Sequence, residues 1–419
     1  MNVLVIGSGG REAALRWALG KSVFVKNIFE APADIGVTQC SWCDSAMHTG
    51  KGLLASYATM NRMKDVNFFI IGPEAPLVAG IKEVFTRAGK AVFGPSRRAA
   101  ELEGSKEAMK LFCKAYGIPT ADFDIARTPE QAKAIVEKRG MPVVIKADGL
   151  AGGKGVKVAD TLEEAFKAID EISQLPAGKS LVIEECLRGW ECSYIVLTDG
   201  KNVFPLLSAM DYKTSQKGEK ENTGGMGCVA PNPLLTPKIE ARILQNIIYP
   251  TIRALREEKR PFTGALYAGL MIINEQPYVL EYNCRLGDPE TQTILPLLRG
   301  DILPYLYGTT NGAMSYRVAE WKRGASVCIV LAAAGYPGKP QLGDAIYGLE
   351  AAERIGGVFI FHAGTKRLPG EKLVTRSGRV LNVVGVGKTL QEARRRAYEA
   401  VGKIHFDGMW YREDIGSLE

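Results

Sequence analysis

Residues 143–158 read VVIKADGLAGGKGVKV, and the fold of the chain can be predicted outward from this stretch. Its β-branched start follows Pro142 and predicts an extended strand. The glycines that follow lack the side chains that would keep the backbone away from a phosphate, and Lys146 and Lys154 add positive charge on either side. The stretch therefore favours a loop that binds nucleotide phosphates, with a plain glycine-rich turn between two strands as the alternative.

The spacing of these glycines excludes two common phosphate-binding loops. A Walker A loop needs GxxxxGK followed by Ser or Thr, and a protein-kinase loop needs GxGxxG ahead of its lysine strand. Residues 143–158 contain neither pattern. Other segments are needed to identify the ligand.

The composition is that of an ordinary globular protein. The chain has 419 residues, 46% of them hydrophobic and 24% charged. This length suits about two to four domains. The formal net charge of +7 is spread along the chain, apart from the basic run Arg394–Arg396 in a helical pattern. This distribution favours anionic small molecules over nucleic acid as partners.

Nothing in the sequence indicates export or disulfide bonding. No basic leader, cleavage site or membrane-spanning apolar run occurs, so the expected location is the cytoplasm, with no membrane partner. The eight cysteines are expected to be reduced thiols, several of them inside apolar segments. Cys40 and Cys43 form a lone CxxC without the second pair or the histidines of a zinc site, which disfavours a metal or redox role.

The N-terminal part of the chain alternates strands and helices like a Rossmann-like domain. Val3–Ile6 is an expected strand followed by a glycine turn and a helix, with further strands expected at Phe68–Ile71 and Ala91–Phe93. In such sheets ligands lie beyond the carboxyl ends of the strands. The loops that begin at Gly7 and Gly72 are therefore expected to wall one site.

The rest of the chain divides into three regions. A compact αβ subdomain is expected over about 117–190, followed by strands, glycine loops and one long helix at Pro237–Glu258. A small α+β domain is expected from about Lys322 onward.

Polar residues gather at the end of one expected strand. Glu281 and Asn283 are two residues apart, so their side chains share a face, and two such oxygen ligands suit Mg²⁺ beside a nucleotide. A solvated strand face is the alternative. Arg285, Asp288 and Glu290 follow in a loop, and loops at strand ends often carry function.

A second acidic group follows the expected strand at 181–185. Backbone groups around Glu184, Glu185 and Leu187 could read an adenine edge, and Glu191 could accept ribose hydroxyls. The alternative is a solvated turn, because acidic residues after a strand are usually exposed.

Taken together, motifs along nearly the whole chain resemble the glycinamide ribonucleotide synthetase family of the ATP-grasp superfamily. They are VLVIGSGGRE, IIGPEAPLVAGI, FGPS, ELEGSKEAMK, VIKADGLAGGKGV, VIEECLRGWECS, NTGGMG, LEYNCRLGDPETQ, HAGTK and GRVLNVVG. The combination of GDPETQ, NTGGMG and GPEAPL is the specific part of the resemblance.

The resemblance implies an α/β and α+β multidomain fold. A Rossmann-like substrate-binding N-terminal domain would span 1–103, and an ATP-grasp domain 104–321 would include the lid subdomain at about 117–190. A small α+β C-terminal domain would span 322–419. We expect a monomer, with a weak homodimer as the alternative.

The resemblance also implies three groups of site residues. ATP would be bound by Lys106, Lys146, Gly152, Gly153, Lys154, Glu184, Glu185, Leu187 and Glu191, and Mg²⁺ or Mn²⁺ by Glu281 and Asn283. Phosphoribosylamine would be bound by Gly9, Gly10, Arg11, Glu12, Pro73 and Glu74. The meeting point of the two substrates would be lined by Asp211, Lys213, Thr223, Gly224, Gly225, Met226, Arg285, Asp288 and Glu290.

The reaction implied by the resemblance is the ATP-dependent ligation of glycine to 5-phosphoribosylamine in purine biosynthesis. ATP would convert the glycine carboxylate to glycyl phosphate, and the amine would then displace phosphate, with Lys146, Arg285 and Asp288 as the catalytic residues. The alternatives are another ATP-grasp carboxylate–amine ligase and a noncatalytic nucleotide-binding protein. A Rossmann dinucleotide-binding protein is disfavoured, because Glu12 replaces the third glycine of GxGxxG.

Three positions depart from the family pattern. Ala13 replaces a usual histidine, the loop at 212–221 has a different charge pattern, and Leu286 replaces a usual phenylalanine. We expect the first to remove a polar contact near the amine substrate and the second to alter closure over the substrates. The third is a packing change that we expect to matter least.

Overall fold

The computed structural model describes residues 1–31, 64–151, 155–216, 222–312, 314, 319–370 and 372–417. Cys40 and Cys43, and the predicted ATP-binding residues Gly152, Gly153 and Lys154, lie outside this set. No helix of the described residues is long and apolar enough to cross a membrane.

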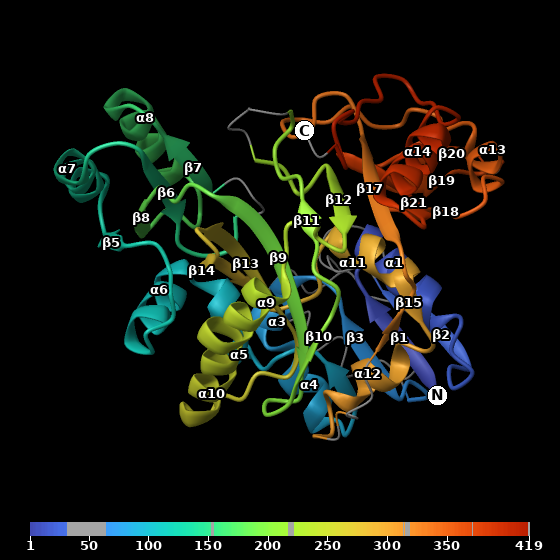
Figure 1. The fold of residues 1–419 in the computed structure, drawn as a ribbon, viewed down its shortest axis with the longest axis horizontal. Coiled ribbons are helices and arrows are strands. Elements are labelled where there is room, and N and C mark those ends of the chain that lie inside the picture. Colours follow the sequence, from blue (N-terminus) through green and yellow to red (C-terminus); the bar gives the residue numbers. More distant parts are fainter. Residues whose placement is uncertain are drawn as a thin grey trace.

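A parallel sheet in the order β2-β1-β3-β4 begins the chain (blue in Figure 1). Its strands are β1 (Asn2–Ile6), β2 (Asn27–Ala31), β3 (Phe68–Ile71) and β4 (Ala91–Phe93). The helices of this part are α1 (Gly10–Leu19), α3 (Glu74–Ala79), α4 (Ile81–Arg87) and α5 (Arg97–Gly104). The Rossmann-like arrangement predicted from the sequence is confirmed, and the loops after β1 and β3 lie at the carboxyl ends of adjacent strands.

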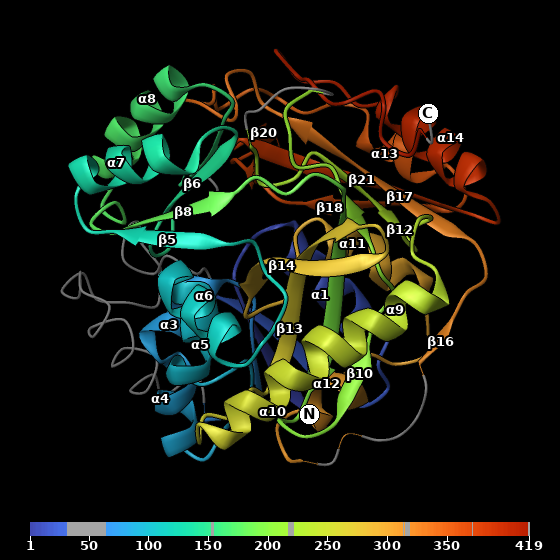
Figure 2. The ribbon, with the colours of Figure 1, turned by 60° about the vertical axis from the view of Figure 1, so that its left-hand side comes forward.

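The opening stretch lies in a separate lobe with its own antiparallel sheet, ordered β5-β8-β6-β7. Its elements are β5 (Phe123–Ala126), α7 (Pro129–Arg139), β6 (Val143–Ala147), β7 (Val156–Ala159), α8 (Leu162–Ser173) and β8 (Leu181–Glu185). Figure 2 shows α7 and α8 on the outer face of this sheet, where Val136, Ile145, Ile169 and Ile183 form part of a small core. Because β6 pairs with β7, the glycine stretch connects two strands of a hairpin.

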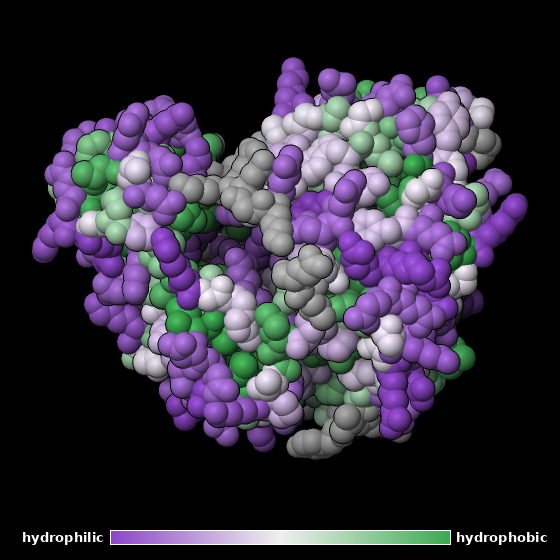
Figure 3. All heavy atoms as spheres, turned by 45° about the horizontal axis from the view of Figure 1, so that its top comes forward, coloured by the Kyte–Doolittle hydropathy of each residue, from purple (hydrophilic) through white to green (hydrophobic). Residues whose placement is uncertain are grey.

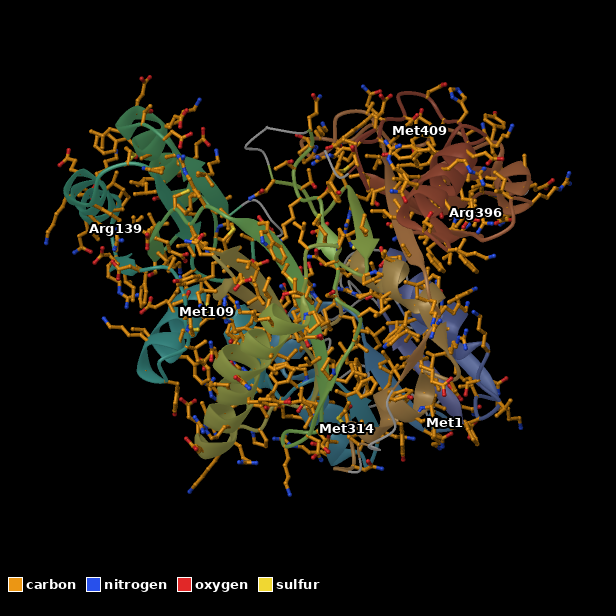
Figure 4. The ribbon with its side chains drawn as sticks, viewed as in Figure 1. Met1, Met109, Arg139, Met314, Arg396 and Met409 are labelled. Carbon is orange, nitrogen blue, oxygen red and sulfur yellow. The ribbon has the colours of Figure 1, made fainter. Side chains whose placement is uncertain are left out.

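The body of the molecule is built on a long antiparallel sheet in the order β10-β9-β13-β14. Its strands are β9 (Trp190–Thr198), β10 (Val203–Pro205), β13 (Gly264–Ile273) and β14 (Gln276–Asn283), and α6 (Lys106–Ala115) lies against β14. Met109, on α6, lies in Figure 4 where the lobe meets this sheet, while Arg139 lies at the outer edge of the lobe.

The long helix expected at Pro237–Glu258 is interrupted. It consists of α9 (Pro237–Ile243), a π-helical turn (Leu244–Ile248) and α10 (Tyr249–Glu257). Pro250 has no backbone N–H and cannot continue the regular ladder of hydrogen bonds, which explains an irregular turn just before it.

The C-terminal sheet, ordered β11-β12-β17-β21-β18, draws strands from two distant parts of the chain. Its strands are β11 (Met210–Asp211), β12 (Gly227–Ala230), β17 (Ala325–Ala332), β18 (Val358–His362) and β21 (Arg379–Gly387). Helix α14 (Leu390–Val401) packs directly on β21. Glycine at 385 permits this close approach, because a Cβ there would lie 2.2 Å from the Ala393 carbonyl oxygen. The segment after Met210, expected to be a loop, thus begins as a short strand that ties the body to this sheet.

Shorter elements complete the described chain. They are β15 (Leu298–Arg299), β16 (Glu320–Trp321), β19 (Thr365–Arg367), β20 (Leu373–Thr375), α11 (Glu290–Ile294), a 3-10 turn (Leu295–Leu297), α12 (Leu303–Gly308) and α13 (Leu349–Glu353). Figure 3 shows a hollow between the lobe and the rest of the molecule. Helix α11 contacts β12, β17 and β21 of the C-terminal sheet.

Candidate active site

Two neighbouring cavities lie where the N-terminal sheet, the lobe and the C-terminal sheet meet. The larger has a volume of about 580 Å³ and the smaller about 320 Å³. Arg11, Pro73 and Asp288 line both, so the two cavities share a wall.

The larger cavity gathers most of the residues that the sequence predicts for the site. They are Arg11, Pro73, Glu74, Lys106, Lys146, Glu184, Glu185, Leu187, Glu191, Asp211, Lys213, Thr223, Gly224, Glu281, Asn283, Arg285, Asp288 and Glu290. Gly9 and Glu12 line the smaller cavity instead. Gly10, Gly225 and Met226 line neither of these two cavities.

A buried lysine pair shares one carboxylate on the lobe side of the larger cavity. Lys146 Nζ lies 2.9 Å from Glu184 Oε2 and donates a 3.0 Å hydrogen bond to the Leu280 carbonyl. Lys110 Nζ lies 3.1 Å from the same Glu184 oxygen. Glu184 is 1% exposed. Its Oε2 pairs with both lysines, whereas its Oε1 has no hydrogen-bond partner among the described residues.

The amide of Glu185 is also in use, donating to the Asp122 carbonyl at 2.9 Å. An adenine base bound at this edge would therefore have to hydrogen-bond to backbone groups that follow Glu185, such as those of Leu187. Glu185 and Leu187 both line the cavity.

Lys106 ties the first helix of the body to the glycine loop. Its Nζ donates a 2.8 Å hydrogen bond to the carbonyl of Gly149, a residue with a φ of +99°. Ser105 caps α6 and donates to Asp148 Oδ1 at 2.9 Å. Burial lowers the pKa of Lys106, although Glu281 opposes this effect.

Glu281 and Asn283 share the larger cavity with Lys213. Lys213 Nζ lies 3.2 Å from Glu191 Oε2 and 3.8 Å from Glu281 Oε1. Burial raises the pKa of Glu281, but Lys213 and the neighbouring lysines outweigh it, so the pKa lies below its usual value. The described residues hold no group of three or more His, Cys, Asp or Glu side chains that could bind a metal.

Two acidic residues, Asp211 and Glu290, line the larger cavity beside Tyr267. The Tyr267 hydroxyl donates a 2.6 Å hydrogen bond to Glu290 Oε1, and Ser193 Oγ lies 2.8 Å from the Tyr267 hydroxyl. Burial and the negative charge of Glu290 raise the pKa of Asp211 well above its usual value. Its Oδ1 has no hydrogen-bond partner within the described parts of the chain.

Arg285 is held between two acids. It lies 3.3 Å from Glu74 and 3.3 Å from Glu103, whose other oxygen accepts a 2.6 Å hydrogen bond from the Cys284 amide. Burial lowers the pKa of Arg285, but the charges of Glu103 and Glu74 more than offset this and keep the guanidinium cationic.

Glu12 shapes the loop of the smaller cavity and is 2% exposed. Its Oε2 accepts a 2.8 Å hydrogen bond from the Gly9 amide, and its Oε1 lies 2.6 Å from Arg11 Nε. A Cβ at Gly72 would lie 1.9 Å from Glu12 Oε1, and one at Gly7, whose φ is +116°, would lie 2.7 Å from its carboxyl carbon. Glu12 therefore stabilises the loop, and glycine at 7 and 72 makes room for it.

Gly10 and Met226 have packing roles. A Cβ at Gly10 would lie 2.2 Å from Asn382 Nδ2, so this glycine lets α1 approach β21. Met226 is 0% exposed and belongs to the core that links the body to both terminal parts.

Comparison with known protein families gives a match along most of the chain. The N domain, the ATP-grasp (A) domain and the C domain of phosphoribosylglycinamide synthetase match residues 1–103, 104–291 and 326–418. This chain belongs to the phosphoribosylglycinamide synthetase family. The resemblance inferred from the motifs is thereby confirmed.

Members of this family match the chain from end to end. The phosphoribosylamine–glycine ligase of Neisseria meningitidis serogroup B is 44% identical over 421 residues, covering 99% of this chain and 98% of the relative. That of Halalkalibacterium halodurans is 43% identical over 422 residues, covering 100% of this chain and 97% of the relative. The crystal structure of the ligase from Thermotoga maritima has a TM-score of 0.81 and 35% identity, covering 99% of this chain and 100% of that chain.

The ATP-grasp fold is shared more widely. A biotin carboxylase from Campylobacter jejuni has a TM-score of 0.68 at 15% identity, covering 97% of this chain and 92% of that chain. A likeness at this identity indicates the fold alone.

Sequence reasoning missed several side chains that lie in or beside this candidate site. They are Glu103, Lys110, Tyr267, Tyr336 and Arg379. Lys110 could have been found, because it lies four residues after Lys106 on one helix face. Tyr336 and Arg379 come from the C-terminal part and gave no local signal.

Proposed function

We propose that this chain joins glycine to 5-phosphoribosylamine at the expense of ATP, giving glycinamide ribonucleotide, ADP and phosphate. The observation that carries the proposal is the shared wall of the two cavities at Arg11, Pro73 and Asp288. One cavity offers cations for a nucleotide, the other a loop for a phosphorylated sugar, and the wall between them offers a place for the two substrates to react.

ATP is assigned to the larger cavity. Lys106 and Lys146 lie beside the glycine loop and would contact the phosphates. The hinge from Glu185 to Leu187 would face adenine, with Glu191 near the ribose. In this arrangement Lys213, now beside Glu191, would also lie close to the phosphates.

A divalent cation fits beside the phosphates. Glu281 and Asn283 place a carboxylate and an amide oxygen in the same cavity, the donor set that Mg²⁺ or Mn²⁺ accepts together with water and substrate phosphates. The Asn283 oxygen now accepts a 2.9 Å hydrogen bond from Arg285 Nη2, which the ion would have to replace. Bound there, the ion would neutralise charge on the phosphates.

Phosphoribosylamine is assigned to the smaller cavity. The loop from Gly7 to Gly9 leads into α1, whose N-terminal amides suit a phosphate. Arg11 and Pro73 then form the side toward the larger cavity.

Glycine is assigned to the end of the larger cavity near Asp211 and Glu290. An ammonium group there would offset the burial and the charge of Glu290 that raise the pKa of Asp211, and Arg285 lines the same cavity for the carboxylate of glycine. ATP would transfer its terminal phosphoryl group to that carboxylate, because a free carboxylate is too poor an electrophile for an amine. Lys146 and Arg285 would stabilise negative charge during the transfer, and exclusion of water would protect the acyl phosphate.

The remaining expectations accompany this proposal. A monomer acting in the cytoplasm is consistent with a small-molecule ligase, and light scattering would measure its mass. Another ATP-grasp carboxylate–amine ligase is the second candidate, because the lobe side of the site would suit any acid that ATP activates.

The test is ADP release with ATP, glycine and phosphoribosylamine, omitting each in turn. We expect ADP release at the full rate with all three substrates, and no amide product when any one of them is missing. Turnover with a different acid or amine, and none with this set, would support the second candidate.

A further inference from the structure

The C-terminal sheet contributes a guanidinium group to the larger cavity. Arg379, the first residue of β21, donates a 3.0 Å hydrogen bond from Nη1 to the Asp288 carbonyl and another to the Gly224 carbonyl. The same nitrogen lies 3.3 Å from Asp288 Oδ1. Arg379 thus links the glycine turn at 223–226 to the loop that contains Asp288.

Among the described residues, the contacts found for the Asp288 carboxylate are made by one oxygen, Oδ1. Gln292 Nε2 donates a 2.7 Å hydrogen bond to Oδ1, the oxygen that also faces Arg379. Oδ2 points toward the loop of the smaller cavity, where a Cβ at Gly9 would lie 3.5 Å from it. Because Asp288 lines both cavities, its side chain lies in the wall that the two cavities share.

The surroundings of Asp288 keep it ionised. The titratable groups that face it are Arg11 from α1, Arg285 from its own loop, Cys328 from β17 and Arg379 from β21. Burial raises the pKa of Asp288, but Arg379 and Arg11 outweigh it, and the pKa lies below its usual value. Burial raises the pKa of the Cys328 thiol, which therefore stays neutral.

We propose that Asp288 Oδ2 takes the proton that the amine of phosphoribosylamine loses, and that Arg379 is the positioning residue that holds Asp288 for this step. This inference rests on the proposed function. The amine nitrogen forms a bond to the carbonyl carbon of glycyl phosphate, and the bond from that carbon to the phosphate oxygen breaks. Phosphate leaves with the electron pair, and the nitrogen proton passes to Asp288 and then to water.

A carboxylate with a low pKa is sufficient for this transfer. The attacking nitrogen carries a positive charge once its bond to carbon has formed, so its proton is far more acidic than that of a free amine. General-base catalysis of this kind contributes roughly 10²- to 10⁴-fold in rate. The C-terminal domain would therefore take part in amide formation and not in ATP use.

The test separates the two half-reactions in the full chain. The wild type and Asp288→Asn are supplied with ATP, glycine and phosphoribosylamine, with and without hydroxylamine, which captures glycyl phosphate as a hydroxamate. We expect amide formation to fall at least about 100-fold in Asp288→Asn, while hydroxamate formation falls less than about threefold. A parallel loss of both products, or amide formation within about threefold of the wild type, would overturn the proposal. Absence of hydroxamate in the wild type would instead count against glycyl phosphate and so against the proposed function.

The role of Arg379 has its own readout. In Arg379→Ala the pKa of Asp288 should rise, because a neighbouring cation is lost, so the acidic limb of the amide-forming rate should move to higher pH. Arg379→Lys keeps the charge and should restore part of the shift. The matched control is Arg395→Ala, an exposed arginine on α14 that pairs with Glu399. An equal loss in Arg379→Ala at every pH, with hydroxamate falling in step, would mean that Arg379 only supports the fold.

Discussion

The lobe side and the junction side of the site are built in different ways. On the lobe side, Lys146 and Glu184 come from adjacent strands of one small sheet, although they are 38 residues apart in sequence. On the junction side, Arg11, Asp288 and Arg379 come from the first, the middle and the last parts of the chain. The first arrangement lies within one small sheet, whereas the second exists only when segments from three parts of the chain are packed together.

The largest effect should come from the lobe side. Lys146→Ala removes a buried cation that also pairs with Glu184, and we expect ADP release to fall at least about 1,000-fold, or about 4 kcal/mol of transition-state stabilisation. Lys157→Ala is the matched control, because Lys157 lies on the adjacent strand β7 and pairs with exposed Glu171. Turnover near wild type in Lys146→Ala would place phosphoryl transfer elsewhere.

The next effect concerns stability on the same side. Lys110→Met leaves Glu184 with one lysine partner, and we expect the free energy of unfolding to drop by about 3 kcal/mol, at the low end for a broken buried pair. Urea denaturation measures this, with Lys114→Met, one turn further along α6, as the control. If both variants unfold at the same urea concentration, Glu184 does not need its second lysine.

The third prediction concerns the proposed metal site in the larger cavity. Glu281→Gln removes charge from the proposed metal site, so turnover at limiting Mg²⁺ should fall more than tenfold, or about 1.4 kcal/mol, with partial recovery at higher Mg²⁺. Glu275→Gln is the control, because Glu275 lies at the turn of the same hairpin, away from the cavities. An unchanged Mg²⁺ dependence in Glu281→Gln would remove this residue from the metal site.

The smallest effect should come from a single contact on the junction side. The Tyr336 hydroxyl accepts a 2.8 Å hydrogen bond from the Gly224 amide, so Tyr336→Phe should slow amide formation by about 2- to 10-fold, in line with one hydrogen bond of about 0.5–1.5 kcal/mol. Tyr347→Phe, an exposed tyrosine in the same part of the chain, should change nothing. A loss greater than about 100-fold in Tyr336→Phe would mean that the turn depends on this contact far more than its geometry suggests.

Most of the lobe side could be predicted from the sequence. The strand that holds Lys146 is β-branched, and the glycines after it mark a tight connection, so composition alone indicated strand, loop and charge. Outside the lobe, on β14 of the body, Glu281 and Asn283 could be paired because the period of a strand is two residues. The sequence did not show that the Glu184 carboxylate pairs with two lysines. The pair with Lys110 depends on how α6 packs against the lobe.

The junction side was harder to predict because its contacts join distant segments. GDPETQ drew attention to Asp288, but nothing in GRVLNVVG indicated that Arg379 reaches the Asp288 loop. The assignment of Glu12 and Gly10 to substrate stays a prediction, and the structure adds contacts of both residues that shape the loop and the packing of α1. Roles of this kind follow from close approach between elements, which no local pattern records.

The central claim is that ATP activates the glycine carboxylate before the amine attacks. The most direct measurement uses glycine labelled with ¹⁸O in both carboxylate oxygens, with mass analysis of the phosphate released in the presence of ATP and phosphoribosylamine. The account predicts one ¹⁸O atom in each phosphate, because the oxygen that bridges carbon and phosphorus leaves with phosphate. Phosphate free of the label would contradict a glycyl phosphate intermediate.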